Sequence, residues 1–394
     1  MLIDFSLLTL VFFAFMYYTF LIKKDYKRIT FLYSFSLITI FYTPSLYFFF
    51  DGEVYRFFSD KNLIYFFHIG TVTICIYLFL SIFIDQYNLK KQRLLINKDN
   101  FFIALYFLGF LIPILLYYIV YFKQFPLVHL FYTGDLIDRP DMTGSIPHFY
   151  TVSTIVSIVI PSIYFFYFIN IKGYYKHFFI NIVMIFLFIA SGNKGFLVYY
   201  FIFIWIYVFK AKLDIRVLLM FILSLVVYAT TKGIQEIDPE LVSYMMNSPF
   251  RRFFVTQGTG FIHRIDMLNE GFDFINNVNP RGLKFDVFQH MYNTNIIGSA
   301  PTFYTGDFLV KYGKVFSFSI FIIISSVLLY VSKFLHKLET NIKLFIYWNI
   351  YAVLFFIVMA EINLSNSLRV FVGIFNIFIV ILLSKIKLKK VKYE

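Results

Sequence analysis

One long polar stretch, residues 232–314, interrupts an otherwise apolar sequence and carries side chains that could do chemistry. Arg251 and Arg252 are adjacent, and Arg264 directly follows His263. Arginine keeps its charge at physiological pH, and its planar guanidinium binds two phosphate oxygens at once. Several arginines on one surface could therefore hold a pyrophosphate group and stabilise the charge that develops on it as it leaves. The alternative is that these charges only solvate a long loop.

The same stretch offers several candidates for a general base. The unperturbed pKa of histidine lies closest to neutral pH, so His263 or His290 could accept a proton from a hydroxyl group. The carboxylates of Asp266, Glu270 and Asp307 compete for this role. For each histidine alone, a surface position without a catalytic role is the alternative, and the sequence does not choose among the five.

Further candidate contacts to a phosphate or sugar lie within and outside this stretch. Arg281 adds a cation to it. Lys194 stands beside Gly195 in a predicted tight turn, where its ammonium group and the backbone could approach a phosphate. An ordinary helical hairpin with a snorkelling lysine is the alternative. Arg369 lies near the end of an apolar run with Glu361, and the two either pair at an interface or serve a function.

The region from Asn295 to Gly313 returns the polar stretch to an apolar run. It contains Asp307 and ends in Tyr312-Gly313, and its Gly and Pro residues predict a loop followed by a helix start. A purely structural role is the alternative for this region. Asp307 and Tyr312 are its candidates for contact with a substrate.

The elements that must position these side chains are apolar helices. Of the 394 residues, 60% are hydrophobic and 14% charged, whereas a soluble globular chain is about half apolar and a quarter charged. Apolar runs of about 20 residues recur, each long enough to cross a hydrocarbon core of about 30 Å. The sequence therefore predicts an all-α polytopic membrane protein of about eleven spans, within a range of ten to twelve. The predicted spans are Leu2–Ile22, Ile29–Phe50, Leu63–Ile84, Phe101–Phe122, Phe149–Ile169, Phe178–Ala190, Phe196–Phe209, Val217–Thr231, Val315–Leu335, Leu344–Leu364 and Val370–Ser384.

Basic residues predict the orientation of these spans. One set of alternate loops together with the C-terminal tail holds 21 of the 35 Lys and Arg residues, against six in the opposite short loops. By the positive-inside rule the richer side is cytoplasmic. We expect an outward N-terminus, a cytoplasmic C-terminus and an outward polar stretch. The chain then divides into residues 1–231 with eight spans, 232–314 as an outward cap, and 315–394 with three spans and a basic tail.

A helix is predicted in the middle of the cap, from Gln257 to Phe274. Phe261, Ile265, Leu268 and Phe272 recur at helical spacing and form one apolar stripe, with His263, Arg264 and Asp266 off it. Such a helix would lie along the membrane surface or against the cap, and an interfacial helix is where the headgroup of a lipid-linked substrate would be met.

Several other classes of function are disfavoured. The sequence contains no DxD or HExxH motif and no carboxylate–histidine cluster at ligand spacing, so we predict neither a metal centre nor another cofactor. The basic residues lie at helix ends and do not form a basic face interleaved with aromatics, which argues against nucleic acid as a partner. The single cysteine, Cys75, excludes a disulfide framework. No cleaved signal peptide is predicted.

The chain resembles the Wzy-type polymerases of oligosaccharide repeat units. The resemblance covers the ten to twelve spans and the dominant outward loop in the second half. It also covers the Ser191–Gly195 turn, the Arg251–Phe253 run and the Gly298-to-Gly313 return. Two positions depart from the family: Asp307 stands where many relatives have Glu, and Lys194 where many have Arg.

The resemblance implies a GT-C-like architecture and glycosyl transfer at the outer face of a bacterial inner membrane. One undecaprenyl-pyrophosphate-linked glycan would be transferred onto another to build O-antigen or capsule, with release of undecaprenyl pyrophosphate and without an obligatory metal. Membrane lipids and a chain-length regulator would be further partners. An O-antigen ligase, another transferase using polyprenyl-linked sugars, and a lipid-linked-sugar transporter are the alternatives. A transporter would be expected to show internal repeats, which we do not find.

Overall fold

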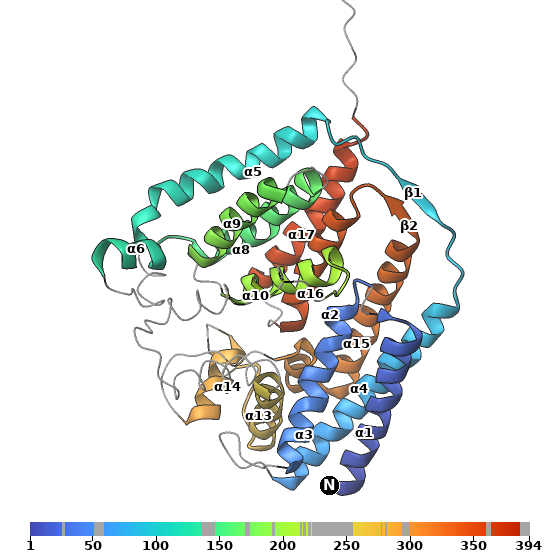
Figure 1. Cartoon of the computed structure of the whole chain (residues 1–394). Helices are drawn as coiled ribbons and strands as arrows, with labels where there is room; N and C mark the ends of the chain where they lie inside the picture. The colour runs from blue at the N-terminus through green and yellow to red at the C-terminus, as the bar shows by residue number, and fades with distance from the viewer. Residues whose placement is uncertain are drawn as a thin grey trace, which may run out of the picture. The chain divides into compact units, whose positions relative to one another are not determined.

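The structure is a computed structural model of the whole chain (Figure 1). It describes residues 1–25, 28–50, 59–134, 146–169, 174–190, 194–212, 255–276, 278–279, 282–293, 300, 302–359 and 364–386, with residues 215, 218, 219 and 222. The predicted span Val217–Thr231 lies almost entirely outside these residues.

The chain divides into two compact units, each assembled from separate stretches of sequence. The first comprises Met1–Gln92, Pro239–Leu338 and Leu354–Asn366, and the second comprises Arg93–Asp238, Glu339–Val353 and Ser367–Glu394. The boundary between the two units at Asp238 and Pro239 falls near the start of the polar stretch, and the described part of that stretch belongs to the first unit.

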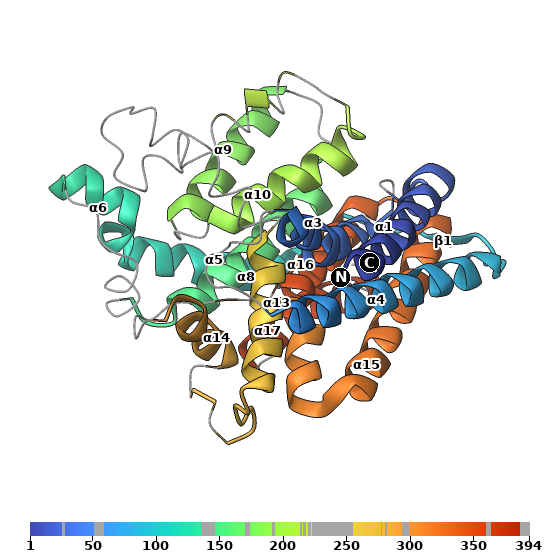
Figure 2. The same cartoon turned by 90° about the horizontal axis from the view of Figure 1, so that it is seen from below.

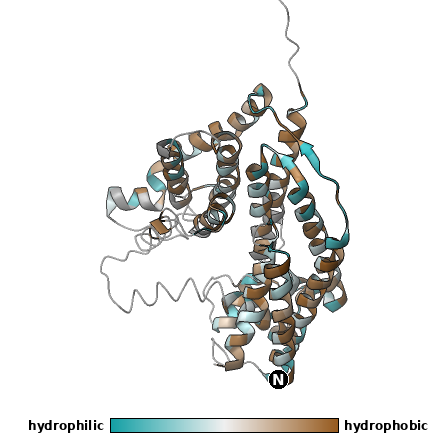
Figure 3. Cartoon of the chain, turned by 45° about the vertical axis from the view of Figure 1, so that its right-hand side comes forward, coloured by the Kyte–Doolittle hydropathy of each residue, from teal (hydrophilic) through white to brown (hydrophobic). Residues whose placement is uncertain are grey.

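The described residues confirm a mostly helical, apolar chain. Six of their helical segments are long and apolar enough to cross a membrane: Leu2–Ile22, Phe31–Phe50, Asp60–Gln86, Phe101–Val120, Thr151–Phe168 and Tyr304–Lys337. Four further predicted spans coincide with shorter apolar helices. Apolar side chains follow these helices along much of their length (Figure 3). The chain is not entirely α-helical, because two short strands, β1 (Gln92–Leu94) and β2 (Leu338–Thr340), pair with each other.

The first unit is built around the helix α4 (Asp60–Gln86), which packs against α1 (Leu2–Met16) and α15 (Tyr304–Lys337). The hydroxyl of Ser59 caps α4 by accepting a hydrogen bond from the backbone N–H of Asn62, at 3.3 Å. The other elements of this unit, with π-type turns labelled η, are η1 (Tyr17–Ile22), α2 (Phe31–Leu37), η3 (Ile38–Tyr42), α3 (Thr43–Phe50), α13 (Gln257–Asn269) and α14 (Leu283–Tyr292).

The helix α15 reverses direction at Gly313. This residue has φ of 83° and ψ of 174°, a backbone conformation that favours glycine. The hydroxyl of Ser317 donates to the carbonyl of Thr305 at 2.9 Å, although twelve residues of straight helix would separate them by about 18 Å. The short segment before Gly313 is therefore folded back against the long one, and Figure 2 shows this sharp bend. The helix start predicted in this region is at Tyr304, and the chain then turns back at Gly313 to form a helical hairpin.

The second unit consists of packed helices joined by buried amides. Trp348 donates from Nε1 to the carbonyl of Ile158 at 3.1 Å. Asn349 donates to Ser162 at 2.9 Å and accepts from Asn376 at 3.1 Å, and both asparagines are fully buried. Hydrogen bonds of this kind join helices in an apolar setting. The elements are α5 (Phe101–Val120), η4 (Phe122–Gln124), α6 (Pro126–Thr133), α8 (Phe149–Ile163), η5 (Tyr164–Phe168), α9 (Tyr174–Ala190), α10 (Lys194–Phe203), η6 (Ile204–Val208), α16 (Lys343–Met359) and α17 (Leu364–Leu383). The C-terminal end of α16 and the N-terminal end of α17 belong to the first unit.

Candidate functional site

The described part of the polar stretch contains the helices α13 and α14, packed side by side, and the first segment of α15. A small apolar cluster holds them together and joins them to the first segment of α15; its buried members are Met267, Phe274, Leu283, Val287, Met291, Ala300 and Val310. The helix α14 ends at Asn293, which adopts a left-handed conformation with φ of 48°. This packing places His290, near the end of α14, against the middle of α13.

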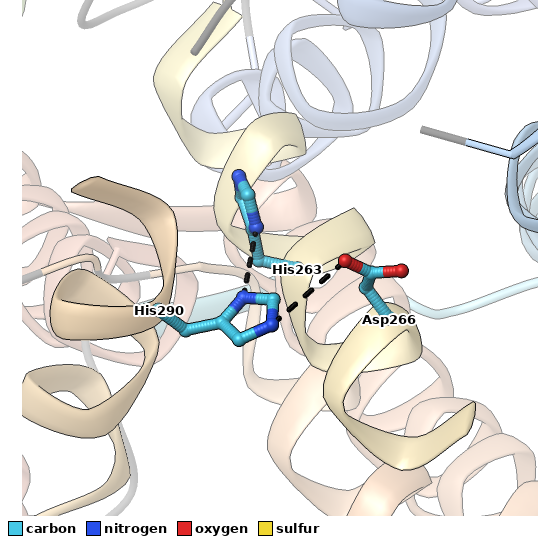
Figure 4. A group of neighbouring side chains, drawn as sticks. All are labelled: His263, Asp266 and His290. Carbon is cyan, nitrogen blue, oxygen red and sulfur yellow. Dashed lines mark hydrogen bonds and ion pairs between the residues drawn. The ribbon is translucent and has the colours of Figure 1, made fainter. Parts of the chain in front are cut away.

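The two candidate histidines form a hydrogen-bonded pair (Figure 4). Nδ1 of His263 lies 3.2 Å from Nδ1 of His290. On its other side, Nε2 of His290 lies 3.0 Å from a carboxylate oxygen of Glu270 and 3.8 Å from one of Asp266. Burial decreases along this chain of groups: His263 is fully buried, the side chain of His290 is 13% exposed and that of Glu270 is 49% exposed. A ligand from solvent therefore meets Glu270 and His290 before His263.

The hydrogen bond between the two imidazoles limits which of their nitrogens can donate. Only one of the two Nδ1 atoms can donate in their shared hydrogen bond. When His290 is protonated on both nitrogens, Nε2–H faces Glu270 and Asp266, and Nδ1–H faces the lone pair on Nδ1 of His263. Both N–H donors of that form then have acceptors.

Asp266 is oriented by the beginning of α4. Its carboxylate accepts a hydrogen bond from Nδ2 of Asn62 at 2.7 Å, and Asn269 donates to Oδ1 of Asn62 at 2.5 Å. Asn62 is buried, at 3% exposure. Asn62 and Asn269 could not be predicted as site residues, because nothing local marks an asparagine in the first turn of a helix as the partner of a carboxylate 204 residues away.

Arg264 is placed differently from the prediction. Its Nε donates to Asp307 at 2.6 Å, and its Nη1 donates to the carbonyls of Gly260 at 2.8 Å and Ala300 at 3.3 Å. The side chain is 1% exposed. Arg264 and Asp307, predicted to contact the pyrophosphate and the substrate, are instead partners in a buried ion pair that joins α13 to the first segment of α15.

The predicted helix begins at Gln257 as expected, but α13 buries more than its single apolar stripe. Nearly all residues from Gly258 to Met267 are buried, including His263 and Arg264 on the supposed polar side, whereas Leu268 of the stripe is exposed. The helix also ends at Asn269, before Phe272. The physical reason is that α13 packs against α3, α4, α14 and α15, so that most of its circumference lies in the core of the first unit.

The histidine cluster also has the donor types of a metal site. One ligand atom from each of His263, Asp266 and His290 can be chosen so that all three lie within 4.8 Å of one another. Two imidazoles and a carboxylate are typical ligands of Zn²⁺ and related ions. This cluster has no ligand spacing along the sequence, because His290 reaches the other two residues only through the packing of α14 on α13.

Other predicted site residues are not joined to this cluster by any described contact. Tyr312 lies in α15, is 61% exposed, and its ring packs against those of Phe308 and Phe316. Arg251, Arg252 and Arg281 lie outside the described residues. Lys194 begins α10 and Arg369 lies within α17, but neither side chain is among those described.

Comparison with known proteins adds no assignment. No protein-family model matches the chain, and no curated protein and no solved structure matches it.

Proposed function

We propose that this protein is a membrane-bound glycosyltransferase of the Wzy type, which joins undecaprenyl-pyrophosphate-linked oligosaccharide units at the outer face of a bacterial inner membrane. The observation that carries the proposal is the Glu270–His290–His263 chain of hydrogen-bonded groups. It places a histidine that is partly open to solvent between a carboxylate and a second imidazole, as a candidate general base.

The position of this cluster within the first unit supports the proposal. Asp266 contacts Asn62 in the first turn of α4, and the basic residues Lys23 and Arg28 contact Asp85 at the far end of the same helix. From Asn62 to Asp85 the helix rises by roughly 35 Å, and the hydrocarbon core of a bilayer is about 30 Å thick. The cluster and the lysine-rich loops therefore have the separation expected of opposite faces of a membrane.

The proposed reaction needs one base and one leaving group. A hydroxyl oxygen of the acceptor glycan forms a bond to the anomeric carbon of the donor glycan. The bond from that carbon to the pyrophosphate oxygen breaks, and undecaprenyl pyrophosphate leaves with the electron pair. In the tautomer of His290 that carries its proton on Nδ1, Nε2 takes the hydroxyl proton while Glu270 orients the hydroxyl group. His263 and Asp266 stabilise the imidazolium that forms.

Arg264 and Asp307 have a supporting role in this proposal. Their ion pair fixes α13 against α15 and so positions His263 and Asp266, which lie one residue before and two residues after Arg264. Direct contact with the pyrophosphate is left to cations elsewhere in the polar stretch, with Arg252 as the foremost candidate.

A deletion strain tests the proposal and distinguishes a polymerase from a ligase. Loss of a polymerase leaves surface glycans that carry single repeat units, whereas loss of a ligase leaves lipid-linked polymer unattached. We expect the former, with long polymer restored by the wild-type chain and not by His290→Ala. His68→Ala, which changes an exposed histidine on α4, is the matched control and should restore polymer. Normal polymer length in the deletion strain would contradict the proposal.

A further inference from the structure

The first unit contains a second polar site, at the opposite end of α4 from the histidine cluster. It is a pocket of about 390 Å³ lined by the end of η1, the turn that follows it, and the C-terminal ends of α4 and α15. All three helical segments that end there are long and apolar enough to cross a membrane. The pocket therefore lies where the apolar part of these helices gives way to polar residues, at the depth of lipid headgroups.

Positive charge dominates the lining of this pocket. Four of its residues, Lys23, Arg28, Lys333 and Lys337, are cations, and Asp85 is the single carboxylate among the lining residues. Even when the nearby buried Asp25 is counted as ionised, cations exceed carboxylates by two. His336 also lines the pocket and adds a further charge when it is protonated.

Some of this charge has a structural role. Arg28 and Lys23 approach the Asp85 carboxylate at 3.1 Å and 3.5 Å, and Lys333 donates to the carbonyl of Ile84 at 2.6 Å, which caps the end of α4. These contacts hold two ammonium groups and one guanidinium group close together. The Asp85 carboxylate is the shared partner of Lys23 and Arg28. Like charges in a half-buried site repel one another, and an anion in the pocket relieves that repulsion.

We propose that this pocket binds the phosphate-bearing headgroup of an anionic phospholipid. The volume is within the range of small-ligand sites, the charge selects a net-negative headgroup, and the neighbouring apolar helix surfaces accommodate acyl chains. The pocket also lies among the loops predicted to be cytoplasmic, and basic pockets on that side are a recognised mode of lipid binding. This inference is independent of the proposed glycosyl transfer.

Lipid binding to the purified full-length chain in neutral detergent tests the proposal. Phosphatidylglycerol is titrated and its retention measured by native mass spectrometry, beside phosphatidylcholine, which has a phosphate but no net charge. Lys337 is exposed, so Lys337→Gln and Lys337→Glu should fold. Since one lysine near a membrane surface contributes a factor of about five, we expect about fivefold weaker retention for Lys337→Gln and about 25-fold for Lys337→Glu.

Controls distinguish this pocket from general attraction between charges. Lys61→Glu makes the same charge change at the opposite end of α4 and should retain phosphatidylglycerol like the wild type. Unfolding midpoints in detergent verify that each variant is folded. Equal retention of the two lipids, or wild-type retention by Lys337→Glu, would overturn the proposal. Displacement of phosphatidylglycerol by millimolar inorganic phosphate would also overturn it, because the ligand would then be a soluble phosphate.

Discussion

The buried pair of Arg264 and Asp307 allows a structural role to be separated from a direct role in substrate binding. Replacing Arg264 by Ala removes three hydrogen bonds and leaves the Asp307 carboxylate, 8% exposed, without its counter-charge. Breaking one side of a buried ion pair typically costs about 3–5 kcal/mol. We expect a loss of this size for Arg264→Ala and a similar loss for Asp307→Ala, measured by thermal unfolding of the purified protein in detergent.

The double variant Arg264→Met with Asp307→Leu completes this test. Apolar side chains of similar volume can replace a buried ion pair at little or no cost in stability, so the double variant should recover most of the loss, as a double-mutant cycle would show. Polymer formation by this stable double variant should also recover, because the pair acts by holding α13 in place. A wild-type unfolding midpoint for Arg264→Ala would refute the reasoning. A stable double variant that makes no polymer would instead indicate that Arg264 contacts the pyrophosphate directly.

Two further predictions concern packing and pH. A Cβ atom on Gly258 would lie 2.4 Å from side-chain atoms of Pro44, so Gly258→Ala should lower stability by about 1–3 kcal/mol despite the helix propensity of alanine, as thermal unfolding would show. Asp25 is fully buried in the turn after η1, and burial raises the pKa of its carboxyl. A carboxyl whose pKa is raised on folding loses stability as pH rises through the interval between its unfolded and folded pKa values. The unfolding midpoint of Asp25→Asn should therefore rise relative to the wild type between pH 4 and pH 7.

Each of these predictions has a control within the same chain. Gly109 lies in α5 with nothing within 4 Å of its Cβ position, so Gly109→Ala should unfold at or above the wild-type temperature. If Gly258→Ala did the same, the close packing of α13 on α3 would be contradicted. For Asp25, a difference between variant and wild type that stays constant from pH 4 to pH 7 would show that its ionisation is not linked to folding.

The apolar helices could be predicted from the sequence because their signal is local. Runs such as Leu2–Ile22 contain both the length and the composition of a span, and this one has the predicted bounds in the structure. The apolar stripe on α13 did not predict how much of the helix is buried, because it identifies only one apolar face. The other face is buried through the small residues Gly258 and Gly260 and through an ion pair between residues 43 positions apart.

The candidate site could be predicted in part. His263 and His290 were selected by the chemistry of their side chains, and the structure brings them together with Asp266 and Glu270. Their grouping was beyond prediction because it depends on the way α14 packs against α13. Likewise, the removal of Arg264 from solvent depends on the reversal of α15 at Gly313, which folds the Asp307 segment inward. Spacing along a sequence contains no information on either event.

Reconstitution in liposomes tests the central claim most directly. The purified chain is supplied with a synthetic undecaprenyl-pyrophosphate repeat unit in the presence of EDTA, and the products are resolved on a gel. The account predicts a ladder of polymer with the wild-type chain and a rate lower by about 10²–10⁴-fold with His290→Ala, as expected for loss of a general base. Absence of polymer with the wild-type chain under these conditions, or equal rates for the two proteins, would contradict it.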